Sequence, residues 1–192
     1  MLDVIYYVAS SLDGYIATKD GGVDWLDRVH IPGEDHGAAK MYASIDAVLL
    51  GSHTYEFALQ LGQWPAPDKP SLVFTKRDLR ILHPSITLTS QAPSEVVEDL
   101  ITRGFRKAWL MGGGKLAASF HASGLISEYV ISVFPILLGS GIPLLAPHSC
   151  NQDALSLVTA KPFKSGIVQL TYRRAEKTSA PRGKRRPKKE KI

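Results

Sequence analysis

Three consecutive glycines, Gly112–Gly114, are the residues of this chain whose type and spacing most directly suggest chemistry. They follow the apolar run 108–111 and precede a helix-like segment that begins at Lys115. Glycine lets a backbone turn sharply and approach a ligand with no Cβ in the way, and a helix start presents unpaired N–H groups to an anion. A strand, a glycine turn and a helix start together predict a phosphate-binding loop. A tight turn without a ligand is the alternative.

Two common phosphate motifs do not fit this loop. A Walker A loop needs glycine at 109 and Ser or Thr at 116, where the chain has Trp109 and Leu116. The dinucleotide fingerprint needs a third glycine at the position of Ala117. A nucleotide bound by these glycines would therefore belong to another fold.

At 192 residues the chain is long enough for one domain with a buried core. Apolar residues make up 44% of it, and no apolar stretch approaches the roughly 18 residues of a membrane helix. A single cysteine, Cys150, excludes an internal disulfide framework and a multi-cysteine metal site. The N-terminus lacks a signal-peptide pattern, so we expect a cytoplasmic protein that uses neither a metal nor a membrane.

Positive charge is concentrated at the C-terminus. Residues 177–192 hold eight Lys or Arg against Glu190, a net charge of +7, and because the whole chain carries +5, residues 1–176 sum to −2. The segment has two prolines and no apolar periodicity, so we expect a disordered tail after a single domain of residues 1–176. A solubilising tail is the simpler interpretation, and nucleic-acid binding is the alternative.

Short apolar runs alternate with helix-like segments through the first two thirds of the chain. This pattern predicts helices at 35–44 and after Ser52, Pro93 and Lys115, and strands at 4–10, 47–50, 71–74, 86–88 and 107–111. Three strand-like runs then follow without helices, at 128–134, 154–160 and 167–172. The order predicts an α/β fold with a mainly parallel central sheet and antiparallel C-terminal strands. Ligands of such sheets bind at the carboxyl ends of strands, so loops 51–54, 75–77 and 112–115 should converge.

Four segments, in this order, resemble dihydrofolate reductase-like proteins: Val8–Ala17, Val48–Glu56, Met111–Gly114 and Pro135–Leu144. They are most similar to the reductase domain at the C-terminus of the bifunctional riboflavin biosynthesis deaminase-reductase. The resemblance spans residues 2–174 and implies a dihydrofolate reductase-like fold, an NADPH site and hydride transfer. The zinc motif of the deaminase half is absent, because the chain has one cysteine.

The resemblance also implies roles in cofactor binding. The three glycines would hold the pyrophosphate, and Lys115 could neutralise it from the first helical turn. Ala9 and Ile16 would line the nicotinamide pocket. Two loops would supply the other contacts: Gly51, Ser52, His53 and Thr54 at the phosphate and ribose, and Thr75, Lys76 and Arg77 at the adenine and 2′-phosphate. Many relatives have arginine in place of Ser52, so the neighbouring cations would have to select NADPH over NADH.

Two residues would belong to the substrate side. Counting back from Gly51, the substrate carboxylate of dihydrofolate reductase falls on Asp35, which could equally be a helix N-cap. Trp25 occupies the position of a tryptophan near that substrate site, and could equally be a core residue. Asp13 is most simply a turn residue before Gly14.

The implied function is a stand-alone NADPH-dependent reductase of a small ribosylamino-pyrimidine substrate. Reduction of a pterin, as in dihydrofolate reductase, is one alternative, and a nucleotide-binding protein without catalysis is another. Relatives often form two-fold dimers, so we expect a homodimer that uses the apolar region Val130–Leu138.

Overall fold

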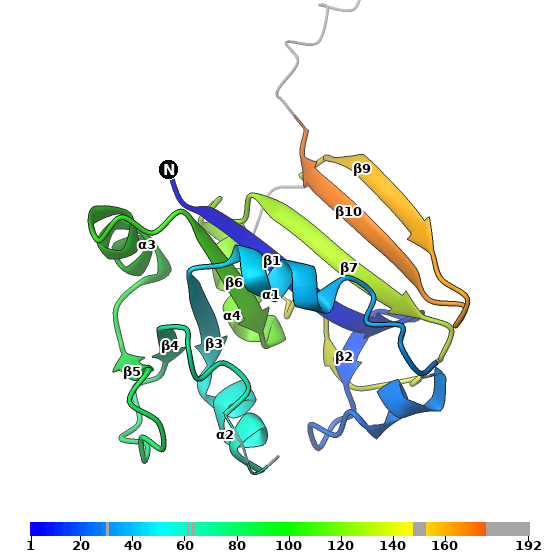
Figure 1. Ribbon diagram of the computed structural model, residues 1–192, viewed down its shortest axis with the longest axis horizontal. Helices are drawn as coiled ribbons and strands as arrows, with labels where there is room; N and C mark the ends of the chain where they lie inside the picture. Colours follow the sequence, from blue (N-terminus) through cyan, green and yellow to red (C-terminus); the bar gives the residue numbers. More distant parts are fainter. Residues whose placement is uncertain (30, 61, 63, 148–152, 176–192) are drawn as a thin grey trace, which may run out of the picture.

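The computed structural model describes residues 1–29, 31–60, 62, 64–147 and 153–175, and the expected tail 177–192 lies outside this part of the chain. Short apolar runs form its strands. In β3 (Ala47–Gly51) the first four residues are fully buried, as expected for a strand covered on both faces. Eight strands make one sheet in the order β5-β4-β3-β6-β1-β7-β10-β9 (Figure 1). Their other bounds are β1 Asp3–Ser11, β4 Ser71–Phe74, β5 Ile86–Thr89, β6 Lys107–Gly112, β7 Glu128–Phe134, β9 Leu155–Pro162 and β10 Val168–Arg174.

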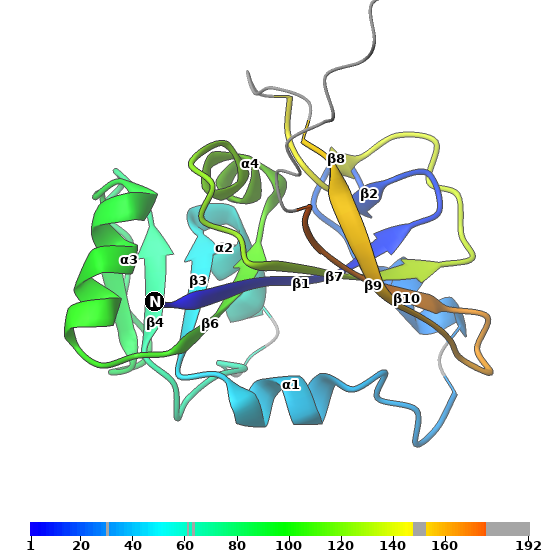
Figure 2. The same cartoon turned by 90° about the horizontal axis from the view of Figure 1, so that it is seen from above.

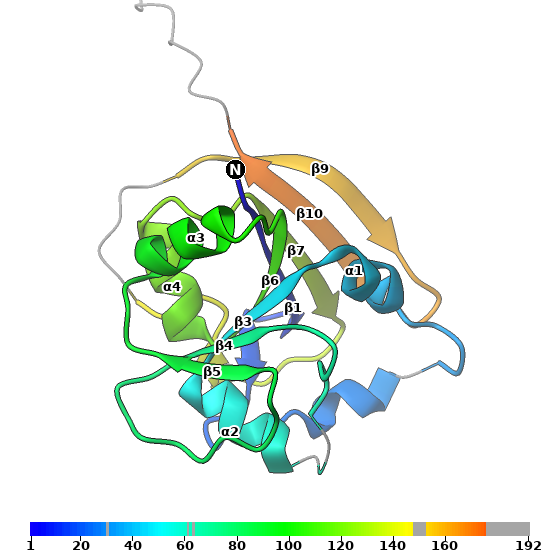
Figure 3. The same cartoon turned by 60° about the vertical axis from the view of Figure 1, so that its left-hand side comes forward.

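The strand directions confirm the predicted fold class. Neighbours from β5 to β7 pair in parallel, whereas β10 is antiparallel to β7 and β9 is antiparallel to β10. The β9–β10 hairpin forms one edge of the sheet and β5 the other (Figure 3). A separate two-stranded sheet pairs β2 (Tyr15–Ala17) with β8 (Ile142–Pro143), which the sequence did not predict. The helices are a 3₁₀ turn at Asp24–Val29, α1 Ala38–Ser44, α2 Ser52–Gln60, α3 Pro93–Thr102 and α4 Gly114–Ala122.

The helices cover both faces of the sheet. On one face α3 and α4 pack over Val4, Leu49 and Leu110, and on the other α1 and α2 pack around Val48 and Leu50. Figure 2 shows α4 and α1 on opposite sides of β1. Alternation along each strand produces this division, because successive side chains point to opposite faces. The loops after β3, β4 and β6 are left at the carboxyl edge.

Helix α1 begins three residues later than the sequence predicted. His36 has φ 53° and Gly37 has φ 85°, both in the left-handed region, so the backbone cannot be α-helical before Ala38. The expected helix start at Asp35 was therefore wrong, and residues 34–37 form an ordered loop instead.

The region expected at the dimer contact lies partly within the sheet. Strand β7, which contains Val130, pairs with β1 on one side and with β10 on the other, so it lies inside the sheet. Residues of β9 are exposed along the whole strand. No helix among the described residues is long and apolar enough to cross a membrane.

Candidate functional site

One large cavity opens at the carboxyl edge of the sheet. Its volume of about 1160 Å³ exceeds the roughly 300–1000 Å³ usual for a small-ligand site, which leaves room for a cofactor and a second molecule. The three predicted loops converge on it, as expected. Nearly all residues to which the resemblance assigned cofactor contacts line it: Ala9, Ile16, Gly51, Ser52, His53, Thr54, Thr75, Lys76, Arg77, Gly113, Gly114 and Lys115. Gly112 is buried behind this wall.

The three glycines of the loop serve different structural needs. Gly112 has φ 118°, which only glycine adopts readily. A Cβ on Gly114 would lie 2.2 Å from the carbonyl oxygen of Pro143, so the loop can pack against 143–146 only with glycine there. A Cβ on Gly113 would meet Thr54 Oγ1 at 3.4 Å and Ile16 Cδ1 at 3.9 Å, which is ordinary contact. Gly113, directly before the start of α4, is thus the lining glycine of this loop at which a side chain would fit without a clash.

The charge around the cavity is one-sided. The described residues that line it include no Asp or Glu. They include five basic side chains: Lys19, His53, Lys76, Arg77 and Lys115. Arg77 pairs with Glu56 of α2 through two hydrogen bonds of 3.0 and 2.7 Å, and that pairing holds the pKa of the Glu56 carboxyl below its usual value. Because α4 also points its N-terminus at the cavity, an anionic ligand with phosphate groups suits this wall.

Another part of the cavity, its aromatic end, is lined by aromatic and apolar side chains. Tyr7 of β1 and Trp109 of β6 line it with their rings edge to face, centroids 6.4 Å apart, and Trp109 Nε1 donates to the Tyr7 carbonyl at 2.9 Å. Val23 and Leu26 complete this wall from the 3₁₀ turn and the residue before it. Sequence reasoning did not identify Tyr7, although it lies two residues before Ala9 in one strand. Period-two alternation places both on one face of the sheet.

Trp25 packs in the core, the second of its two interpretations, and it is not among the residues that line the cavity. Only 4% of it is exposed, and its ring packs edge to face on Phe134 at a centroid distance of 5.4 Å. The 3₁₀ turn directs Trp25 inward beside Ile167, whereas its neighbour Leu26 lines the cavity.

Asp35 lies just before α1 and does not line the cavity. Its exposed carboxylate accepts hydrogen bonds from the backbone N–H groups of Gly37 at 2.9 Å and Ala39 at 3.1 Å. These bonds hold the pKa of the Asp35 carboxyl below its usual value. Gly37 is the N-cap residue of α1, so Asp35 is not the N-cap itself, although its carboxylate binds the first-turn amide of Ala39. The Asp35 side chain thus faces the start of the helix and is not among the residues that line the cavity.

The described residues contain no group of three or more His, Cys, Asp and Glu side chains that could hold a metal ion.

Known proteins share this sequence pattern and fold. YwjB of Bacillus subtilis, which is uncharacterised, is 36% identical over 172 residues, covering 89% of this chain and 97% of YwjB. A Shewanella sp. PV-4 protein, provisionally assigned to riboflavin biosynthesis, has a crystal structure with a TM-score of 0.82 at 29% identity, covering 92% of this chain and 100% of that one.

A bifunctional enzyme shows the same fold in one of its halves. It is the diaminohydroxyphosphoribosylaminopyrimidine deaminase/5-amino-6-(5-phosphoribosylamino)uracil reductase of Thermotoga maritima, with a TM-score of 0.69 at 15% identity. The match covers 91% of this chain and 57% of that enzyme. The sequence profile described as the RibD C-terminal domain matches residues 3–169, and the chain therefore belongs to the RibD C-terminal domain family.

Proposed function

We propose that the protein is an NADPH-dependent reductase of the riboflavin-biosynthesis type, with a small molecule such as 5-amino-6-(5-phosphoribosylamino)uracil as hydride acceptor. Family membership supports the reaction class, and the acceptor is the one named for the Thermotoga maritima enzyme. The observation that carries the proposal is that one cavity joins a glycine loop and five basic side chains to an aromatic end, without a described carboxylate.

The residues present fit a dinucleotide phosphate. Gly113 leaves a cradle that a longer side chain would fill, between Thr54 and Ile16. Gly113, Gly114 and Lys115 would hold the pyrophosphate, with Gly51, Ser52, His53 and Thr54 along the phosphate and ribose. Thr75, Lys76 and Arg77 would meet the adenine and 2′-phosphate, and Ala9 would border the nicotinamide. The pyrophosphate and 2′-phosphate would provide counter-charges that the described wall itself lacks.

The bound cofactor would supply the hydride, so the chain has to bind, orient and shield the two partners. Tyr7 and Trp109 offer flat apolar surfaces to a heterocyclic acceptor. Asp35 is a poor candidate for the acid, because its carboxylate binds the amides of Gly37 and Ala39 and does not line the cavity. A pterin reductase would need a carboxylate in the cavity at the position of Asp35, so we favour a pyrimidine acceptor.

The test is incubation of the protein with NADPH and a panel of acceptors. Turnover is measured as the loss of the reduced-nicotinamide absorbance. Oxidation with 5-amino-6-(5-phosphoribosylamino)uracil and none with dihydrofolate is the expected result. The reverse preference would favour the pterin alternative. Tight NADPH binding by calorimetry, with no turnover of any acceptor, would indicate a nucleotide-binding protein without catalysis.

A further inference from the structure

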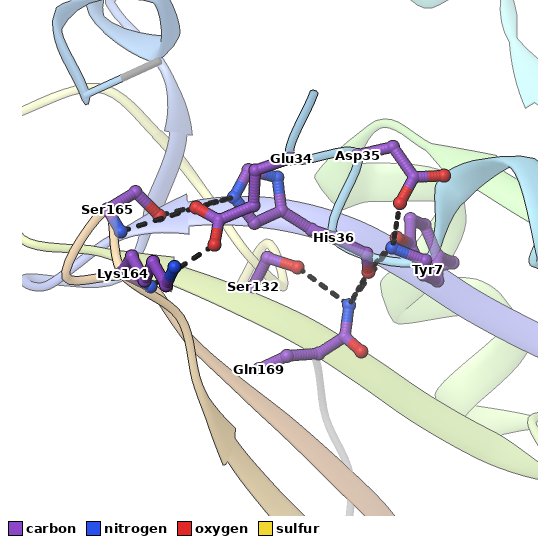
Figure 4. A network of polar contacts seen from close by, with 9 residues as sticks. Tyr7, Glu34, Asp35, His36, Ser132, Lys164, Ser165 and Gln169 are labelled. Atoms are coloured by element: carbon purple, nitrogen blue, oxygen red, sulfur yellow. Dashed lines mark hydrogen bonds and ion pairs between the residues drawn. The ribbon is translucent and has the colours of Figure 1, made fainter. Parts of the chain in front are cut away.

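The aromatic end of the cavity is held by a network of uncharged hydrogen bonds (Figure 4). The Tyr7 hydroxyl donates to the main-chain carbonyl of His36 at 3.2 Å. Burial raises the pKa of Tyr7, so this hydroxyl stays protonated and neutral at physiological pH. Tyr7 thus presents its ring to the cavity while its hydroxyl is fixed to the loop 34–37.

A single side-chain amide holds this arrangement together. Gln169 Nε2 lies 3.0 Å from the His36 carbonyl oxygen, 3.1 Å from Ser132 Oγ and 3.4 Å from Tyr7 Oη. Because the His36 carbonyl can only accept, the nitrogen of the amide must face it. Gln169 pairs with Ser132 across β10 and β7, so the amide joins these strands to β1 and to the loop.

The loop is fixed independently from its other side. The His36 ring packs edge to face on Phe163 at 4.8 Å, and its Nε2 lies 3.3 Å from Ser165 Oγ. The Glu34 carboxylate accepts the backbone N–H groups of Lys164 and Ser165 at 3.2 and 3.3 Å. These contacts with the β9–β10 turn hold His36 in its left-handed conformation, which directs the carbonyl at Tyr7 and Gln169.

On the basis of the proposed function, we infer that Gln169 is a positioning residue for the acceptor. It acts through Tyr7 and His36, which it locks in the geometry that forms the aromatic end of the cavity. The part of the wall proposed to bind the phosphates and adenine is formed by other elements, the loops after β3, β4 and β6, so loss of the Gln169 amide should affect the acceptor and leave the NADPH affinity nearly unchanged.

The experiment compares Gln169→Leu, which removes the amide donors at similar size, with Tyr7→Phe, which removes only the hydroxyl. Arg173→Gln is the control, because Arg173 lies on the same strand and its exposed ion pair with Glu128 contributes little. With 5-amino-6-(5-phosphoribosylamino)uracil as the probe, KM should rise about tenfold in Gln169→Leu because a set of part-buried hydrogen bonds is lost, with kcat nearly unchanged. Tyr7→Phe should raise KM less, and the double variant should be non-additive.

Hydrogen exchange gives a readout that needs no acceptor. Amides of residues 31–37 should exchange faster in Gln169→Leu than in the wild type or the control, with the NADPH dissociation constant unchanged. Unchanged exchange would overturn the inference. A parallel loss of NADPH affinity would also overturn it, because Gln169 would then support the whole fold. If the wild type does not turn over the probe, the proposed acceptor fails, and the exchange measurement still decides the role of Gln169.

Discussion

Gly113 and Gly114 are neighbours in the sequence, yet the structure gives them opposite sensitivities to substitution. Gly113 has φ −79°, which any residue adopts, and its Cβ direction leads into the cavity. Gly113→Asp should therefore fold and place a negative charge where the pyrophosphate is proposed to bind. We expect the NADPH affinity to fall more than tenfold, about 1.4 kcal/mol or more, in calorimetric titration.

Gly114→Ala provides the contrast. Its Cβ would overlap the Pro143 carbonyl, so the expected defect is a lower melting temperature. A Gly113→Asp variant that melts like the wild type and binds NADPH equally well would remove the glycine loop from the cofactor site.

Asp13 illustrates how a turn residue can stabilise a distant loop. Its carboxylate accepts the Ser11 hydroxyl at 2.6 Å and the backbone N–H groups of Leu138 and Gly139 at 3.1 and 2.6 Å. These bonds, that of Ser11 foremost, lower the pKa of Asp13. Because the folded pKa lies below the unfolded value of about 3.9, this stabilisation is complete above about pH 4 and is lost as pH falls through the folded pKa.

Asp13→Asn should accordingly lower the melting temperature at pH 7, and the difference from the wild type should shrink on acidification below about pH 4. Thermal melts across pH measure this directly. Asp27→Asn, at an exposed position in the 3₁₀ turn, is the control and should melt like the wild type. A difference between Asp13→Asn and wild type that is the same at every pH would show that the carboxylate charge is irrelevant.

Elements that consist of continuous apolar runs were predicted well. Elements whose boundaries depend on residues with unusual backbone angles were not. The runs at β3 and β6 and the glycines after β6 placed the cavity loops correctly. The start of α1 was misplaced because the left-handed conformation of His36 depends on its contact with the β9–β10 turn. Nothing in the sequence near His36 indicates that contact. Tyr7 was missed for a related reason, since its role depends on partners far along the chain.

We propose that coenzyme preference depends on α2 and the loop after β4. Glu56 of α2 holds Arg77 by a bidentate contact, and Lys76 beside it has no ion pair among the described residues. If these cations bind the 2′-phosphate, NADPH should raise the melting temperature more than NADH at equal concentration. The double change Lys76→Ala, Arg77→Ala should abolish that difference.

Glu56→Gln is the matched control, because it removes the acidic partner and leaves both cations in place. Its preference for NADPH should persist or increase. If NADPH and NADH stabilised the unmutated protein equally, the protein would not discriminate between the two cofactors. The presence of Ser52 in place of arginine would then mark that loss.

At the scale of the whole molecule, the two edges of the sheet differ. β5 has four residues, two of them buried, whereas all eight residues of β9 are exposed, including Leu157 at 54%. An exposed apolar strand edge favours association. The homodimer stays a prediction, with its contact now expected at β9 rather than at Val130–Leu138. Light scattering at micromolar concentration should give about twice the 21.0 kDa chain mass.

Leu157→Asp should shift this dimer to monomer, because it places a charge in the proposed contact. Leu137→Asp is the control, since Leu137 is 70% exposed on a different loop and should leave the mass unchanged. A monomeric wild type would contradict the prediction of a dimer, and a dimer that resists Leu157→Asp would place the contact elsewhere.

The basic segment dominates the charge of the molecule, and we predict that the proposed site does not need it. The family match ends at residue 169, and those described residues that line the cavity lie between 7 and 147. Removing residues 177–192, whose composition offers little apolar surface to bury, should leave the melting temperature and NADPH binding nearly unchanged. The calculated charge would change from +5 to −2, so binding should move from cation to anion exchangers. A truncated protein that melts earlier or binds NADPH more weakly would instead show that these cations contact the body, and the domain boundary at 176 would have to be moved.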